Sequence, residues 1–385
     1  MVSKSLTLLA FLLSQVSEGQ QKFSDGIGFS TTVTGDFVKN FDGGTKRGFT
    51  YLGKEELTFD LNTSKAGLWK NGHLFIHGLN THGKGPSENL TGDLQVLSNI
   101  EAGDHTGLFE FWYSQEFGKF VFLVGQNDMN KEFLGTKYTE VFLNSSFGIM
   151  PSVSLNMPVS IYPLAGLGFL IKYRTSQNFI CKIGVYDGNP GNFDNNRYNL
   201  AWNINLQEGI FGIGEVEYSW YNNDQEVGDL KIGTYIHTGE FFNYFDTLKH
   251  TNGNYGVYLL TEKALFPRSL TIGRGLCIFF QGGLTTPSIN MVHYFIGGGL
   301  RYHGILPNRY YDQLGIGIAH ISLSYDFINY TPGTLSNETA FETTYAFHFG
   351  GRYVIQPCLQ YILNPGATKN IGNSFVGILR FSLTY

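Results

Sequence analysis

The feature that most constrains this chain is a two-residue alternation of side-chain type, which recurs in segments of about ten residues. The last segment, 375–385, shows it most clearly. Its odd-numbered positions are apolar or glycine, from Phe375 to Tyr385, whereas Arg380 and two hydroxyl residues occupy even-numbered positions. Successive side chains of a β-strand point to opposite faces. The segment is therefore predicted to be a strand with one apolar face, aromatic at its ends, and one face that carries charge.

Counting these segments predicts the architecture. Seventeen candidates follow the pattern: 27–38, 49–62, 72–80, 107–117, 120–127, 164–175, 179–187, 198–206, 210–222, 229–238, 254–262, 269–281, 291–303, 313–325, 340–349, 354–363 and 374–385. A bacterial single-chain barrel has an even number of strands, short periplasmic turns and long extracellular loops. Counting strands from the N-terminus and from the C-terminus places each connection on the same side of the membrane only if 198–206 is an excursion inside an extracellular loop and not a strand. The prediction is an all-β fold, a transmembrane β-barrel of sixteen antiparallel strands. Its long outer segments would be 81–106, 128–163, 187–209, 238–253 and 325–340.

Composition separates a membrane barrel from a soluble β-sandwich, which alternates as well. Charged residues make up 15% of the chain, against about 25% in a typical soluble domain. The 33 Phe and 23 Tyr gather at strand ends, as in the aromatic girdles of outer-membrane barrels. In 108–116 the alternation puts Phe109, Phe111 and Tyr113 on the lipid face and Glu110 and Trp112 on the polar face. The net charge of −5 argues against a nucleic-acid partner, and the aromatic content argues against disorder.

The N-terminus has the features of a secretory signal. Lys4 precedes a short apolar run, 6–13, and Ser17 and Gly19 supply the small residues of a cleavage site. We therefore expect a signal peptide at 1–19 and one barrel domain at 20–385.

Motifs for catalysis and cofactor binding are missing from the sequence. The three cysteines form no CxxC pair, so neither a disulfide scaffold nor a zinc site is expected. His73 and His77 would lie about 13 Å apart on a strand, which argues against a shared metal. There is no GxSxG, HExxH or phosphate-binding loop. We expect no enzyme activity and no cofactor.

Segment 128–163 is the longest stretch without clean alternation. It carries three prolines yet is too rich in large apolar residues for disorder. Such a loop on a barrel is best satisfied by folding into the lumen, where it would narrow the pore.

The sequence resembles the carbohydrate-selective porin OprB family. The matching stretches run in family order: 34–36, 40–44, 46–48, 92–95, 98–102, 142–148 (FLNSSFG), 235–239, 338–340, 356–360 and 361–366. The resemblance implies a sixteen-stranded outer-membrane porin that passes monosaccharides such as glucose by facilitated diffusion. Two positions depart from expectation. The chain ends in Tyr385 rather than Phe, and Glu55 falls on the lipid face, which suggests a position near the rim or a bulge.

Lumen-facing charges and one tryptophan are the candidate sugar contacts. A sugar needs paired donors and acceptors, which carboxylates and Arg or Lys supply, plus an aromatic surface such as Trp112. The alternative is that these charges only solvate the wall or pair with one another. The predicted pore-lining residues are Glu101, Glu110, Trp112, Glu116, Lys172, Arg174, Glu215, Glu217, Arg301, Glu342 and Arg380. The family resemblance further implies a constriction loop containing Phe142, Asn144, Ser145, Ser146 and Phe147, with Glu101 close to the narrowest point.

The functional hypothesis is therefore a porin for small carbohydrates in the outer membrane of a Gram-negative bacterium, in contact with its lipid, as a monomer or a homotrimer. Two alternatives remain open from sequence: a secreted β-sandwich lectin, and a barrel channel for other solutes such as organic acids.

Overall fold

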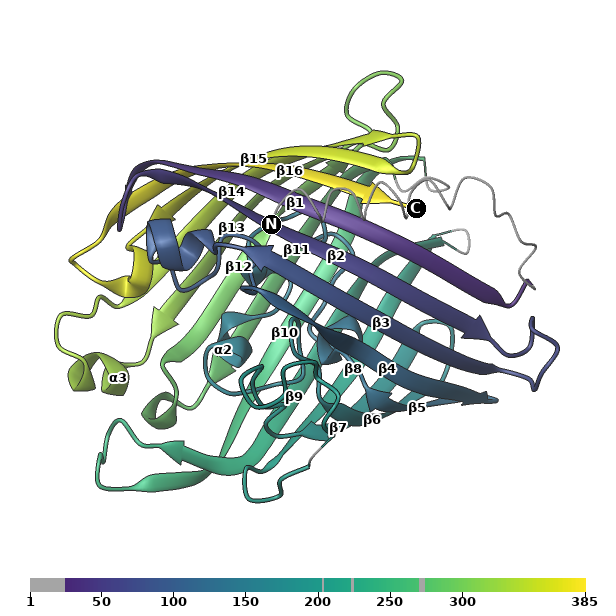
Figure 1. Cartoon of the computed structure of the whole chain (residues 1–385), viewed down its shortest axis with the longest axis horizontal. Helices are drawn as coiled ribbons and strands as arrows, with labels where there is room; N and C mark the ends of the chain where they lie inside the picture. Colours follow the sequence, from purple (N-terminus) through teal and green to yellow (C-terminus); the bar gives the residue numbers. More distant parts are fainter. Residues whose placement is uncertain (1–24, 203, 223–224, 270–273) are drawn as a thin grey trace.

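The computed structural model describes residues 25–202, 204–222, 225–269 and 274–385, so the predicted signal peptide lies outside the described residues. The described chain forms one closed barrel in which every strand is antiparallel to its sequence neighbours and β1 closes on β16 (Figure 1). The predicted sixteen-stranded barrel is confirmed, and the β-sandwich alternative is wrong. The strands are β1 (Ile27–Gly44), β2 (Gly48–Asn62), β3 (Gly72–Gly83), β4 (His105–Phe117), β5 (Phe120–Gln126), β6 (Leu167–Arg174), β7 (Phe179–Asp187), β8 (Ile210–Asn222), β9 (Gln225–Phe242), β10 (His250–Ser269), β11 (Arg274–Thr285), β12 (Val292–His303), β13 (Gln313–Leu323), β14 (Asn337–Phe349), β15 (Tyr353–Leu363) and β16 (Gly372–Thr384).

The two ends of the barrel differ in their connections. The start of β1 and the end of β16 lie at the same end of the barrel, where the Thr31 N–H donates to the Tyr385 carbonyl (2.9 Å). A short turn, Phe117 to Phe120, lies at this same end. The longest connections, 84–104, 127–166 and 188–209, all lie at the opposite end. The turn end is therefore assigned to the periplasm and the loop end to the exterior.

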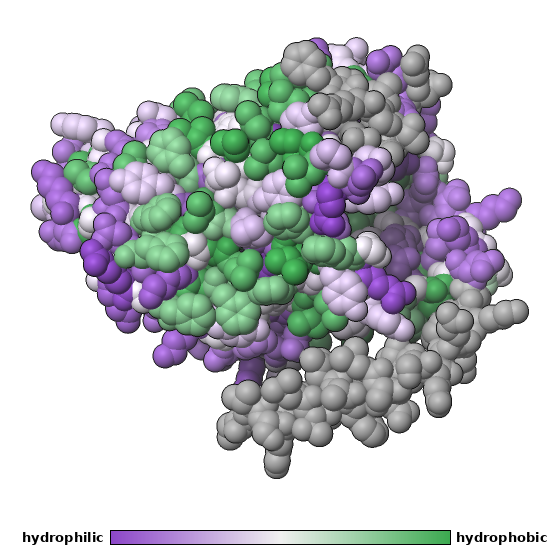
Figure 2. All heavy atoms as spheres, turned by 90° about the horizontal axis from the view of Figure 1, so that it is seen from above, coloured by the Kyte–Doolittle hydropathy of each residue, from purple (hydrophilic) through white to green (hydrophobic). Residues whose placement is uncertain are grey.

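The outward face of the barrel is apolar across its middle. Outward side chains such as Leu57, Ile232 and Val257 are more than half exposed. Figure 2 shows apolar side chains gathered over the middle of the molecule and hydrophilic ones toward its ends. A surface of this kind requires hydrocarbon around it, because soluble proteins rarely expose so large an apolar area. Among the described residues, no helix has the length and apolar character to cross a bilayer.

The loop 127–166 lies inside the barrel and contains the short helix α2 (Pro151–Ser154) (Figure 1). It packs on a part of the inner wall that is built from glycine. A Cβ added to Gly317 would lie 2.8 Å from the Phe147 ring and 2.9 Å from the Phe142 ring. Those rings pack against each other (4.3 Å between centroids), and the Phe142 ring also packs against Phe279 of β11 (5.3 Å). The two loop rings can therefore approach β13 closely because Gly317 has no side chain in their way.

Two predictions about side-chain direction were wrong. Phe109 points into the lumen rather than to lipid, because the β3–β4 register shifts between His77 and Gly78 and adds one residue to β4. Glu55 lies neither at a rim nor at a bulge. It sits mid-strand in β2, in continuous register with Val33 and Asn80. Asn80 at the paired position gives Glu55 a polar neighbour on the outer face.

Candidate functional site: the lumen and its loops

Loops cover much of the inner wall from β10 to β16, and several polar residues there face loop backbone rather than water. Glu342 of β14 is 1% exposed, and its carboxylate accepts hydrogen bonds from the N–H groups of Leu143 (2.7 Å) and Asn144 (2.8 Å). Glu262 of β10 accepts from the Tyr138 N–H (2.9 Å) in the same way. These wall carboxylates hold the 127–166 loop by satisfying backbone donors that would otherwise be buried without partners.

The 84–104 loop is held by a second set of wall residues. Arg380 of β16 forms a two-pronged ion pair with Asp36 of β1, with N–O distances of 2.7 and 2.8 Å. The Ser98 hydroxyl of the loop donates to the same carboxylate (2.7 Å). All three groups are buried, so Arg380 binds the wall and loop together.

On the opposite wall, along β2 to β4 and β6, several inward side chains remain partly exposed, and we call it the open wall. A chain of charges crosses it. Lys54 contacts Glu56 (2.9 Å), Glu56 contacts His77 (3.3 Å), and His77 contacts Glu110 (3.2 Å). Glu110 also pairs with Lys131 of the 127–166 loop, whose ammonium is about half exposed. Acids and bases alternate along this row, which leaves it with little net charge.

An aromatic pair lies beside that row. The rings of Phe75 and Trp112, both half-buried, have centroids 5.2 Å apart and planes at 31°. His73 meets the edge of Trp112 (5.1 Å) and bonds Asp60 (2.6 Å). On the other flank, the Lys131 ammonium lies 5.1 Å from the Phe75 ring centroid. The open wall thus offers an apolar surface with hydrogen-bonding groups on both sides.

Further ion pairs continue the alternation around β4 to β8. Each links a residue of the predicted set to an opposite charge: Arg174–Glu116 (3.0 Å), Lys172–Glu132 (2.7 Å), Lys182–Glu215 (2.6 Å) and Lys182–Glu217 (3.1 Å). The pairing that sequence left as an alternative for these charges is therefore present.

Burial raises the pKa of several loop carboxyls. Burial, together with neighbouring Asp93, raises the pKa of Glu101 to about 7. Burial, together with Glu110, raises the pKa of Asp128 to about 7. Glu101 accepts from the Ser87 N–H (3.3 Å), so it closes the 84–104 loop on itself.

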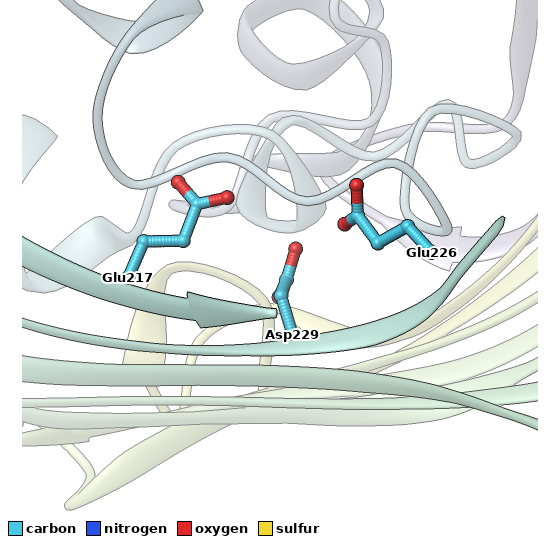
Figure 3. A group of neighbouring side chains, drawn as sticks. All are labelled: Glu217, Glu226 and Asp229. Carbon is cyan, nitrogen blue, oxygen red and sulfur yellow. The ribbon is translucent and has the colours of Figure 1, made fainter. Parts of the chain in front are cut away.

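The carboxylates of Glu217, Glu226 and Asp229 approach within 4.8 Å of one another (Figure 3). Each also has a lysine ammonium nearby. The pairs are Lys182–Glu217 (3.1 Å), Lys137–Glu226 (2.8 Å) and Lys231–Asp229 (3.5 Å). Each of the three carboxylates already has an ammonium partner, with Lys182 shared between Glu217 and Glu215, so the donor set suits an ion-pair network better than a bound cation.

The structure places the predicted pore residues in three environments. Trp112, Glu116, Lys172, Arg174, Glu217 and Arg301 face the accessible lumen, with Arg301 over the Tyr138 ring (4.5 Å). Glu110, Glu215, Glu342 and Arg380 are buried, and Glu101 is half-buried in the 84–104 loop. Of the predicted constriction residues, Phe142, Asn144, Ser146 and Phe147 lie buried between loop and wall, and only Ser145 is half-buried.

Sequence reasoning did not single out Phe75, His73, Lys54 or Lys131 for solute contact. Phe75 could have been found, because the alternation puts it between His73 and His77 on the polar face of β3. Lys131 could not, since only the fold brings it to Glu110.

A closed sixteen-stranded barrel with an apolar exterior, a charged lumen and an inserted loop defines the porin class of membrane channel. The model of the carbohydrate-selective porin OprB family matches residues 46–385, so the chain belongs to that family. This family and the fold point to a channel rather than an enzyme.

The chain is similar to known porins over most of their length. The chain is 22% identical over 411 residues to a putative porin, QuiX, of Acinetobacter baylyi, covering 96% of this chain and 91% of that protein. It is 22% identical over 407 residues to Porin B of Pseudomonas aeruginosa, covering 94% and 88%. The high-pH structure of Pseudomonas putida OprB superposes with a TM-score of 0.86 at 20% identity, with 94% of both chains covered. The low-pH structure of that protein superposes with a TM-score of 0.60 at 16% identity, covering 94% of this chain and 93% of that one.

Proposed function

We propose that this porin carries small neutral sugars passively across the outer membrane of a Gram-negative bacterium, and that they slide along the Phe75–Trp112 surface of the open wall. The aromatic pair supports this proposal most strongly. A pyranose presents C–H groups on its faces and hydroxyls on its rim. The tilted rings suit the faces, and the flanking His73–Asp60 and Lys131–Glu110 pairs suit the rim.

Liposome swelling tests the proposal, with glucose compared against gluconate, an anion of similar size. We expect the wild type to pass glucose faster. Trp112→Ala is expected to reduce the glucose rate about fivefold, the equivalent of about 1 kcal/mol of lost stacking, with a small effect on gluconate. Trp220→Ala is the matched control, because Trp220 lies on β8 with outward parity beside Tyr218.

Two outcomes would count against the proposal. Equal wild-type rates for glucose and gluconate would remove sugar selectivity while leaving the pore. An unchanged glucose rate in Trp112→Ala would remove the aromatic surface from the transport path.

A further inference from the structure

Strands β5 and β6 are too short to span a bilayer on their own. They have 7 and 8 residues, whereas a membrane strand needs about 9–11. At a rise of about 3.3 Å per residue and a tilt of about 40°, they cover about 18 and 20 Å of an apolar band about 25 Å tall. β5 ends at Gln126, opposite Phe111, so β4 has no β5 partner from Glu110 up to His105.

The loop 188–209 covers this gap from outside the barrel. The Leu108 N–H of β4 donates to the Tyr198 carbonyl (2.9 Å), which takes the place of a missing strand partner. Trp202 stacks on the outward ring of Phe111 (5.7 Å, 16°) and donates to the Gln126 side chain (2.6 Å). The loop therefore lies flat on the wall instead of projecting into water.

The described side chains of 198–206 alternate between the outside and the barrel wall. The apolar ones lie on the outside with half or more of their surface exposed: Tyr198, Leu200, Trp202, Ile204 and Leu206. Asn199 points inward and donates to the Ala165 carbonyl (2.9 Å). Five large apolar side chains in alternation would be costly in water, and they continue the lipid-facing surface of which Phe111 is part.

Part of the backbone of the segment is satisfied by one of its own side chains, without a neighbouring strand. The Asn196 side chain accepts from the N–H groups of Leu200 (3.0 Å) and Ala201 (3.1 Å) and donates to the Ala201 carbonyl (3.0 Å). Irregular backbone is tolerated near hydrocarbon only when its polar groups have internal partners. Asn196 supplies three of them.

We infer that the alternating residues Tyr198, Leu200, Trp202, Ile204 and Leu206 form a piece of the membrane-facing wall, with lipid acyl chains as their partner. The loop completes the apolar band where β5 and β6 fall short. The inference concerns the outer surface and requires only that the barrel lies in a bilayer. It is independent of which solute passes through the lumen.

Spin labelling tests it in phosphatidylcholine vesicles. A nitroxide is attached at Leu200→Cys in a chain carrying Cys181→Ala, because Cys277 and Cys358 are buried. Collision with oxygen, which concentrates in hydrocarbon, is compared with collision with a nickel chelate, which stays in water. Heat-modifiable gel migration selects the folded protein.

Two control positions calibrate the result. Val257→Cys on β10 reports lipid, and Leu248→Cys, whose side chain is 95% exposed in the loop after β9, reports water. We expect Leu200→Cys to match the oxygen-to-nickel ratio of Val257→Cys and to exceed that of Leu248→Cys severalfold. A ratio like that of Leu248→Cys would overturn the inference. Low access to both reagents, with dipolar broadening between labels, would also overturn it, because a second copy would then cover the surface.

Tryptophan quenching gives a second readout that needs no label. In a protein whose only tryptophan is Trp202, lipids with brominated acyl chains are expected to quench the fluorescence strongly. Fluorescence unaffected by these lipids would place the segment outside the hydrocarbon. Both readouts concern the outer surface, so failure of sugar selectivity in the swelling assay leaves them unaffected.

Discussion

Replacing Glu342 with alanine should release the lumen loop. The carboxylate accepts the N–H groups of Leu143 and Asn144 at 2.7 and 2.8 Å, in a place that water does not reach. A buried donor left without a partner costs about 1–3 kcal/mol, so losing both bonds is worth about 2–6 kcal/mol. This cost falls on the docked position of the loop, because the strand bonds of β14 are untouched.

The expected result is a wider and noisier channel. In planar bilayers Glu342→Ala should raise the single-channel conductance and its fluctuations, and in detergent its barrel should unfold at a lower temperature. Glucose and anion fluxes should rise together, because the loop narrows the path for both. Glu116→Ala is the control, since Glu116 forms a half-exposed pair with Arg174 worth at most about 1 kcal/mol.

The reasoning fails if Glu342→Ala matches Glu116→Ala in conductance, noise and unfolding temperature. A selective loss of glucose flux at unchanged conductance would contradict it in another way. That result would make Glu342 a sugar contact rather than a support for the loop.

Three further perturbations follow from the same contacts. Arg380→Ala leaves Asp36 buried without its partner and should destabilise the barrel by about 3–5 kcal/mol in urea unfolding, more than Arg380→Lys does. Gly317→Val places carbon atoms against the Phe147 ring, 2.8 Å from the Cβ position, and should raise conductance as loop displacement does. Glu101 has a pKa raised to about 7, so its protonated form is favoured by the folded loop. Stability is then greatest below about pH 4.5 and falls by about 3 kcal/mol as the pH rises past 7, and unfolding scans should show that Glu101→Gln removes this dependence.

The alternation of side chains was sufficient to predict the barrel, because each strand must show one face to lipid and one to water. The alternation did not predict the parts of strands that lie outside the hydrocarbon, where this requirement does not apply. β9 and β10 extend well beyond the predicted 229–238 and 254–262, to Phe242 and back to His250. These extensions rise outside the hydrocarbon, where a strand has no need of an apolar face.

The segment 198–206 shows that alternation of apolar and polar side chains does not always mark a β-strand. It alternates because it lies on the barrel wall, yet its described residues pair with β4 through a single backbone bond, from Leu108 to Tyr198. Parity of the strand count excluded it correctly. The physical requirement that produces alternation is a two-sided environment, and a loop lying flat on the wall meets that requirement too.

The lumenal site was only partly predictable. Sequence placed Glu342 on the polar face but could not tell whether it meets water or a loop N–H, because that depends on where the loop folds. Glycines at inward strand positions were a further signal in the sequence for where a loop covers the wall. Gly315 and Gly317 occupy inward positions of β13, and an inner wall without side chains is one that something else covers.

The way in which the lumenal charges are satisfied argues for a neutral solute. A carboxylate that faced open water without a partner would attract cations, and a free ammonium would attract anions. In this lumen Glu342 and Glu262 are occupied by backbone N–H groups, and the accessible Lys54, Glu56 and Lys131 alternate in sign along one row. A solute on the open wall therefore meets hydrogen-bond donors and acceptors but little net electrostatic field. A polyhydroxylated molecule can exchange its water for such groups at low cost, whereas an ion loses its hydration shell without gaining a counter-charge.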